Sequence, residues 1–146
     1  MAADFTTAAQ MIGIMYNACH GGFAFSEAAV AEYNRRKDPS TPTLDRLAHG
    51  LDRTDPLMIE ICSDMRYDAN GLYADIKVEY IPIRYKDHFI ITEDSGIESV
   101  DIDYNGYTLD KIRGILHNDV IANDHKIELL LEIVNANFPS GAFSLE

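Results

Sequence analysis

The sequence has no tryptophan, only two cysteines, and half as many basic as acidic residues, with 12 Lys and Arg against 24 Asp and Glu. The formal charge of −12 repels phosphates at long range, so we expect no direct binding of nucleic acid and no attraction to anionic membrane surfaces. No apolar run approaches the roughly 18 residues of a membrane span, and no signal peptide opens the chain. These absences together predict a protein of the cytoplasm.

Familiar catalytic and metal motifs are missing as well. The five histidines lack C-x-x-C or H-E-x-x-H partners, which argues against a zinc site. Cys19 and Cys62 lie in separate apolar segments, which is typical of buried, reduced thiols. Local spacing assembles no nucleophile with a base, no phosphate loop and no dinucleotide fingerprint, so we predict no catalytic residue, cofactor or metal. Carboxylates distant in sequence, such as Asp64 and Glu93, would have to meet in the fold to make an enzyme.

What the sequence does contain predicts one α+β domain over 1–146. Apolar residues spaced by three and four predict helices, which we place at 6–19, 26–37, 44–50, 55–70, 109–116 and from Asn123 onward. After Gly71 the period becomes two, and the expected strands are 76–82, 88–92 and 100–104.

These elements give a helical half (1–70), a sheet (72–109) and C-terminal helices (109–137). We expect an antiparallel three-stranded meander packed against several helices. Such a sheet has open edges that a symmetric partner could cover, so a homo-oligomer is possible.

The segment SVDIDYNGYTLD (99–110) fits either a calcium loop or a hairpin. Asp101, Asp103 and Asn105 fall at the first ligand positions of an EF-hand loop, but Ile112 stands where that loop needs a bidentate Glu. The residues before Asp101 also alternate as in a strand. The interpretation that we favour is a type I′ hairpin turn at Asn105–Gly106.

Basic residues are concentrated in a short part of this acidic chain. Six of the twelve fall within 32 positions, namely Arg35, Arg36, Lys37, Arg46, Arg53 and Arg66. If the helices that carry them meet, arginine and aromatic side chains would form a pocket for a phosphate or carboxylate ligand. The candidate residues are Arg35, Arg36, Arg53 and Arg66 for anion contacts, Phe23, Tyr33 and Tyr67 for stacking, and Gly21 and Gly22 for close backbone approach.

A structural alternative stays open for these arginines. Each could pair with a nearby acid, Arg46 with Asp45 or Asp52 and Arg53 with Asp55, and so only decorate helix ends.

An acidic cluster without basic neighbours follows in the predicted sheet. Its members are Glu93, Asp94, Glu98, Asp101 and Asp103. Such a cluster could bind a basic protein surface, although the solvent-facing side of a half-buried sheet produces the same alternation.

Four segments, taken in order, resemble a family of small uncharacterised proteins encoded by bacteriophages and large DNA viruses. They are GGFAFSEAAVAEYNRR (21–36), DRTDPLMIEI (52–61), ANGLYADIKVEYIP (69–82) and ITEDSGIESV (91–100). That family has no settled activity, so the resemblance implies a genetic setting rather than a mechanism. Segment 38–51 looks inserted relative to the family pattern.

The resemblance and the residues together favour a non-enzymatic viral protein in the cytoplasm of an infected cell. It would counter host defence by sequestering a small anionic, nucleotide-like signal through the arginine and aromatic residues. The alternative is an acidic inhibitor that blocks a basic surface of a host protein through the cluster from Glu93 to Asp103.

Overall fold

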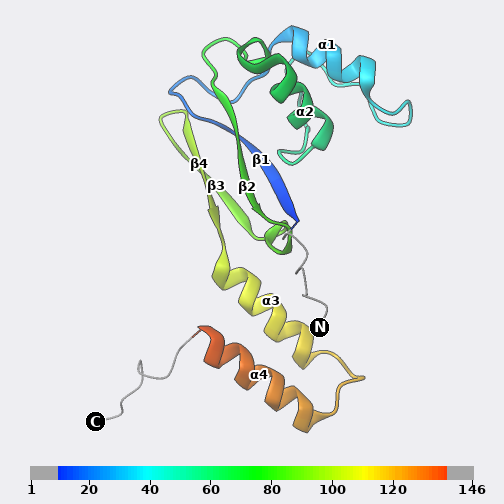
Figure 1. The fold of residues 1–146 in the computed structure, drawn as a ribbon, viewed down its shortest axis with the longest axis vertical. Helices are drawn as coiled ribbons and strands as arrows, with labels where there is room; N and C mark the ends of the chain where they lie inside the picture. Colours follow the sequence, from blue (N-terminus) through cyan, green and yellow to red (C-terminus); the bar gives the residue numbers. More distant parts are fainter. Residues whose placement is uncertain (1–9, 138–146) are drawn as a thin grey trace, which may run out of the picture. The chain divides into compact units, whose positions relative to one another are not determined.

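The computed structural model describes residues 10–137, which form two compact units, one up to Ile102 and one from Asp103. In the first unit the order is β1 (Met11–Asn17), α1 (Glu27–Arg36), α2 (Pro56–Met65), the 3₁₀ turn η1 (Arg66–Ala69), β2 (Ile76–Pro82), the 3₁₀ turn η2 (Ile83–Tyr85), β3 (Phe89–Asp94) and β4 (Ile97–Ile102) (Figure 1). The predicted α+β class is confirmed.

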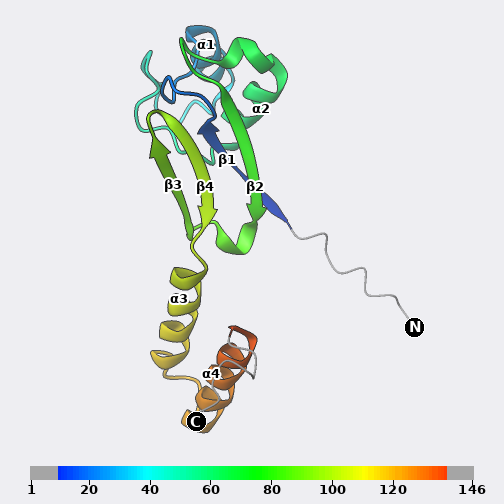
Figure 2. The same cartoon turned by 90° about the vertical axis from the view of Figure 1, so that its left-hand side faces the viewer.

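The strands form two separate antiparallel pairs. β1 pairs with β2 from Met11 opposite Pro82 to Asn17 opposite Ile76, and β3 pairs with β4 in a second two-stranded sheet (Figure 2). The predicted three-stranded meander is therefore wrong, because β2 takes its partner from the start of the chain instead of from β3.

Strand β1 lies where the apolar spacing predicts the first helix, over 6–19, and that prediction is also wrong. Residues 6–9 of the predicted helix lie outside the described part of the chain. Every residue from Gly13 to Met15 is buried, and a continuous apolar run has no period that distinguishes a buried strand from a helix. Gly13 suits close strand packing, since a Cβ there would lie 2.8 Å from Val78 Cγ1.

The chain after β4 continues into a helix instead of a hairpin turn. Asp103 is the N-cap of α3 (Tyr104–Leu116), and its carboxylate accepts a hydrogen bond of 2.9 Å from the Gly106 N–H. The type I′ turn predicted at Asn105–Gly106 is thus wrong, because Asp103 satisfies a free N–H of the first helical turn. Ser95–Gly96 joins β3 to β4 instead, with φ of 54° and 90°.

Helices α1 and α2 are confirmed, including their starts. The Ser26 hydroxyl accepts the Ala29 N–H before α1, and the Asp55 carboxylate accepts the Met58 N–H before α2. Both caps satisfy N–H groups that have no partner inside the helix.

The short helix predicted at 44–50 is wrong, because this segment forms turns. The Asp45 carboxylate accepts hydrogen bonds from the N–H groups of Leu47 and His49, at 3.1 and 3.0 Å. Side-chain hydrogen bonds of this kind compete with the backbone hydrogen bonds of a helix.

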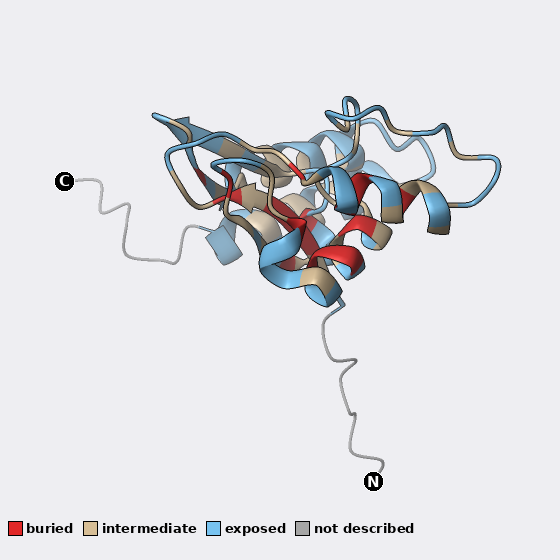
Figure 3. Cartoon of the chain, turned by 90° about the horizontal axis from the view of Figure 1, so that it is seen from above, coloured by how far each residue is buried: buried red, intermediate tan, exposed pale blue. Residues whose placement is uncertain are grey.

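The core of the first unit lies between β1, α1 and α2 (Figure 3). Its largest fully buried apolar side chains are Met15, Met58 and Ile61. Ile14 is also fully buried but belongs to the opposite face of β1. Cys62 is buried in the core as predicted, and this burial raises the pKa of its thiol to about 11.

The second unit contains two helices up to Asn137, α3 and α4 (Asn123–Asn137), which confirm the predicted C-terminal helices. Neither helix has a buried residue. Within residues 10–137, no helix combines the length and apolar character that crossing a bilayer requires.

Candidate functional site

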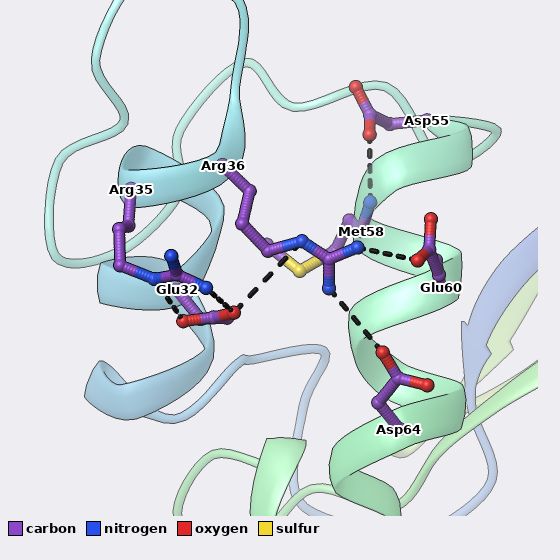
Figure 4. Close-up of polar contacts among 7 residues, drawn as sticks. All are labelled: Glu32, Arg35, Arg36, Asp55, Met58, Glu60 and Asp64. Atoms are coloured by element: carbon purple, nitrogen blue, oxygen red, sulfur yellow. Dashed lines mark hydrogen bonds and ion pairs between the residues drawn. The ribbon is translucent and has the colours of Figure 1, made fainter.

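The predicted anion pocket needs arginines that are free to bind a ligand, and two of them are held by carboxylates (Figure 4). Arg35 donates two hydrogen bonds to Glu32, one turn earlier on α1, at 2.6 and 2.9 Å. The bond from Arg35 holds the pKa of Glu32 below its ordinary value. Arg36 extends from α1 toward α2 and lies between Glu60 and Asp64. The positive charge of both arginines is thus compensated locally.

Arg53 is held even more firmly, by Glu98 on β4. Its guanidinium donates to both carboxylate oxygens, at 2.8 and 2.9 Å, and lies 3.4 Å from the centre of the Phe23 ring. Glu98 is only 8% exposed. Burial by itself would raise the pKa of Glu98, but hydrogen bonds from Arg53 and from the Asn17 N–H outweigh it, so the pKa lies below its ordinary value.

Asn17, which sequence reasoning missed, connects this ion pair to two loops. Its side-chain amide donates to the carbonyls of Cys19 and Gly96, both at 2.8 Å, and its oxygen accepts the Asp75 N–H at 2.9 Å. The only sequence signal was a polar residue at the end of an apolar run. Because Asn17 is fully buried, this network fixes the positions of the surrounding backbone.

Tyr33 is also committed to the fold. It is 4% exposed, and its hydroxyl donates to Asp55 at 2.9 Å. Burial and, as the smaller cause, this hydrogen bond raise the pKa of Tyr33 to about 12. Asp55, the nearby partner considered for Arg53, is therefore bound to Tyr33 instead. Arg46 pairs with neither Asp45 nor Asp52 but with Glu27, at 3.4 Å.

The other predicted ligand residues lie near a groove formed by the loop before β2. The groove has a volume of about 650 Å³ and is lined by Cys19, Tyr67, Asn70, Gly71, Leu72, Tyr73, Ala74 and Asp75. Tyr67, Leu72 and Tyr73 are 82%, 80% and 77% exposed. Arg66 directly precedes Tyr67, is itself exposed, and has no ion-pair partner within the described part of the chain.

One wall of the groove is held in an unusual conformation. Tyr73 has φ of 61°, a left-handed conformation that is rare for bulky residues and is concentrated at functional sites. Gly21 packs so closely on Tyr73 that a Cβ would lie 1.5 Å from the Tyr73 carbonyl oxygen. The Cys19 thiol donates to the same oxygen at 3.0 Å. Cys19 is only half-buried, so the predicted burial of its thiol is wrong. Gly22 is exposed, with nothing within 4 Å of its Cβ position.

The predicted acidic cluster is divided by the β3–β4 register. Asp94 and Asp101 share one face, where Ile90 and Ile97 stand directly opposite them across the pair. Glu98 belongs to the other face and is buried against Arg53.

The remaining two acidic residues have local roles. Glu93 accepts the Gly96 N–H, and Asp103 caps α3 in the second unit.

Among residues 10–137, no group of three or more His, Cys, Asp or Glu is arranged to hold a metal ion. Asp64 pairs with Arg36 and Glu93 bonds to Gly96, so neither carboxylate of the suggested catalytic pair lacks a local partner. Comparison of the chain with protein-family models, with curated proteins and with solved structures finds no match. The resemblance to phage and viral proteins stays a prediction.

Proposed function

We propose that the protein is a non-enzymatic binding protein that sequesters a small anionic, nucleotide-like ligand in the groove beside Tyr67 and Tyr73. The supporting observation is that two tyrosines and a leucine stand more than three-quarters exposed at a groove of about 650 Å³. Arg66, which precedes Tyr67 in the chain, is exposed and has no ion-pair partner among residues 10–137. This volume falls in the usual range for small-molecule sites. Exposed aromatic rings provide stacking platforms for bases, and a free guanidinium binds phosphate oxygens.

The charges near the groove suggest how such a ligand would be oriented. The phosphate would lie toward Arg66 and away from Asp75, an acidic residue that lines the groove and pairs with Lys77 at 3.7 Å. A carboxylate in this position instead accepts hydrogen bonds from ribose hydroxyls. The proposal therefore favours a nucleotide over a simple inorganic anion.

This version of the pocket differs from the one expected from sequence. Arg35, Arg36 and Arg53 already have carboxylate partners, so Arg66 is the arginine that would make the anion contact. The resemblance to viral proteins supports a host defence signal as the ligand and the infected cell as the setting.

Isothermal calorimetry against a panel of mononucleotides, linear dinucleotides and cyclic dinucleotides tests the proposal. We expect micromolar binding of at least one nucleotide, weakened about tenfold or more by Arg66→Ala because a charged hydrogen bond is lost. Tyr67→Ala should weaken it by roughly 1–3 kcal/mol, the usual contribution of a stacked base.

Arg35→Ala is the matched control, since Arg35 is an exposed arginine already paired with Glu32. It should leave the affinity unchanged. No heat with any nucleotide, or equal losses for Arg35→Ala and Arg66→Ala, would contradict the proposal.

A second candidate function is the block of a basic protein surface by β3 and β4. The observation that favours it is the exposed face on which Asp94 and Asp101 stand with Ile90 and Ile97, two apolar residues that are 49% and 37% exposed. Such a complex should weaken in high salt and on Asp94→Lys with Asp101→Lys. A partner retained by that double variant in a pull-down would rule this face out.

A further inference from the structure

The second unit presents an apolar surface that nothing in the described chain covers. No residue of α3 or α4 is buried. Several large apolar residues of the unit are nevertheless about half exposed or more, and these are Tyr104, Leu109, Leu116, Val120, Ile127, Leu131 and Val134. Helices of 13 and 15 residues are at or near the lower limit for stability in water unless an apolar face is packed.

The exposed residues follow the spacing of a helix-packing seam. On α3, Leu109 and Leu116 are seven residues apart, and on α4, Ile127, Leu131 and Val134 recur at four and three. Residues at these spacings lie on one side of a helix. Each helix therefore has an exposed apolar stripe, and that of α3 begins at Leu109, which lines a hollow together with Asn137 of α4.

We propose that a second copy of this chain covers these stripes, so that two α3–α4 hairpins form an antiparallel four-helix bundle. Two-helix hairpins with apolar stripes are the halves from which such bundles are made. A two-fold symmetric interface needs only one surface that is complementary to itself.

The exposed area is consistent with a stable dimer. The five side chains of the two stripes are 45–59% exposed and present on the order of a few hundred square ångströms of apolar surface. A standard interface takes roughly 800 Å² from each partner, including its polar rim. The apolar surface of one hairpin is thus of the size that forms the centre of such an interface.

The charges of the two helices favour the same partner. α3 carries one acidic and two basic residues, for a net charge of +1, whereas α4 carries three acidic and one basic, for a net charge of −2. In a bundle of two hairpins, each helix lies beside one helix of its own copy and one of the other. Placing α3 beside α4 of the second copy brings opposite charges together and keeps like charges on the diagonal.

Sedimentation velocity of the full chain over a range of concentrations tests this proposal. We expect the mass of two chains at tens of micromolar and dissociation on dilution. Leu109→Asp combined with Leu131→Asp should raise the dissociation constant at least tenfold, because two charges would enter the apolar seam. Leu47→Asp, at a leucine of the first unit that is 64% exposed, should leave the dimer intact.

Three further variants test the charges and the end of the chain. Lys111→Glu with Arg113→Glu should weaken the dimer, and adding Glu128→Lys with Glu132→Lys should restore it by exchanging the charges of α3 and α4. A chain that ends at Asn137 should still dimerise. The proposal would be overturned by a monomer at all concentrations or by a dimer that the Leu109 and Leu131 changes do not affect. Loss of the dimer on truncation would also overturn it, because the interface would then need residues 138–146.

Discussion

The two units of the chain obtain their order in different ways. The first unit has a core of buried side chains and a partly buried ion pair, Arg53–Glu98. Both carboxylate oxygens of Glu98 accept hydrogen bonds from Arg53, and one of them also accepts the Asn17 N–H. The second unit has two helices over its described residues, 103–137, and none of these residues is buried. Because apolar burial is the main favourable term in folding, the first unit has its own source of stability, whereas the proposed dimer would supply that burial to the second unit.

The difference also separates the two proposed activities. The groove lies on a loop that the Asn17 network and Gly21 hold in place, so it is part of a rigid support. The apolar stripes of α3 and α4, in the proposed dimer, are covered by a second copy instead. Ligand binding and self-association should therefore be separable by mutation.

The largest effect is expected from Glu98→Ala in the first unit. Loss of the carboxylate leaves the guanidinium of Arg53 without its partner in a partly buried site, and breaking such a pair costs about 3–5 kcal/mol. Urea unfolding measures this change. Arg46→Ala breaks an exposed pair with Glu27 and should cost less than about 0.5 kcal/mol. Similar costs for the two variants would show that the Arg53–Glu98 pair is not a main support of the unit.

A slightly smaller effect is expected when the core is truncated. Ile61 is fully buried, so Ile61→Ala should lower the free energy of unfolding by about 2–5 kcal/mol. Ile127→Ala, at a residue of α4 that is 59% exposed, should leave unfolding of the first unit unchanged and weaken self-association instead. Urea unfolding and sedimentation of both variants measure the two effects. An equal loss of stability would remove the contrast between the units.

The stability of the first unit should also depend on pH through Glu98. Its pKa is lowered by folding, so its contribution is present above the unfolded value of about 4.5 and is lost as pH falls through the folded value. The difference in unfolding free energy between the wild type and Glu98→Gln should therefore be largest near pH 7 and shrink below pH 4.5. Urea titrations at several pH values measure it, and a difference that grows on acidification would contradict the assignment.

The smallest effect is expected at the start of α3. Asp103→Ala removes the cap that accepts the Gly106 N–H and should cost about 1 kcal/mol, seen as lower helix content by circular dichroism. Asp103→Asn retains a capping oxygen and should change little. If both variants leave the helix signal intact, Asp103 does not cap this helix.

Local signals in the sequence were enough to predict the capped helices. Ser26 and the Asp55–Pro56 pair marked α1 and α2 because capping depends on residues within one turn of each other. The alternation after Gly71 located β2 and β3 for the same reason. Features of short range were therefore predictable.

Features that depend on distant partners were not. The run around Ile14 reads equally as helix or strand until β2 supplies a neighbour more than sixty residues later. Arg53 was paired with Asp55, two positions away, whereas its actual partner Glu98 is 45 residues away. The groove is likewise formed where Gly21 meets Tyr73, a contact that no local pattern marks.

Hydrogen–deuterium exchange at two protein concentrations tests the central claim, that the first unit supports itself and the second is ordered by a second copy. Above the dissociation constant, amides of both units should be protected. On dilution well below it, protection should be lost in α3 and α4 and retained at β1, α1 and α2. Protection of α3 and α4 that is the same at every concentration, or loss of protection in both units together, would contradict the account.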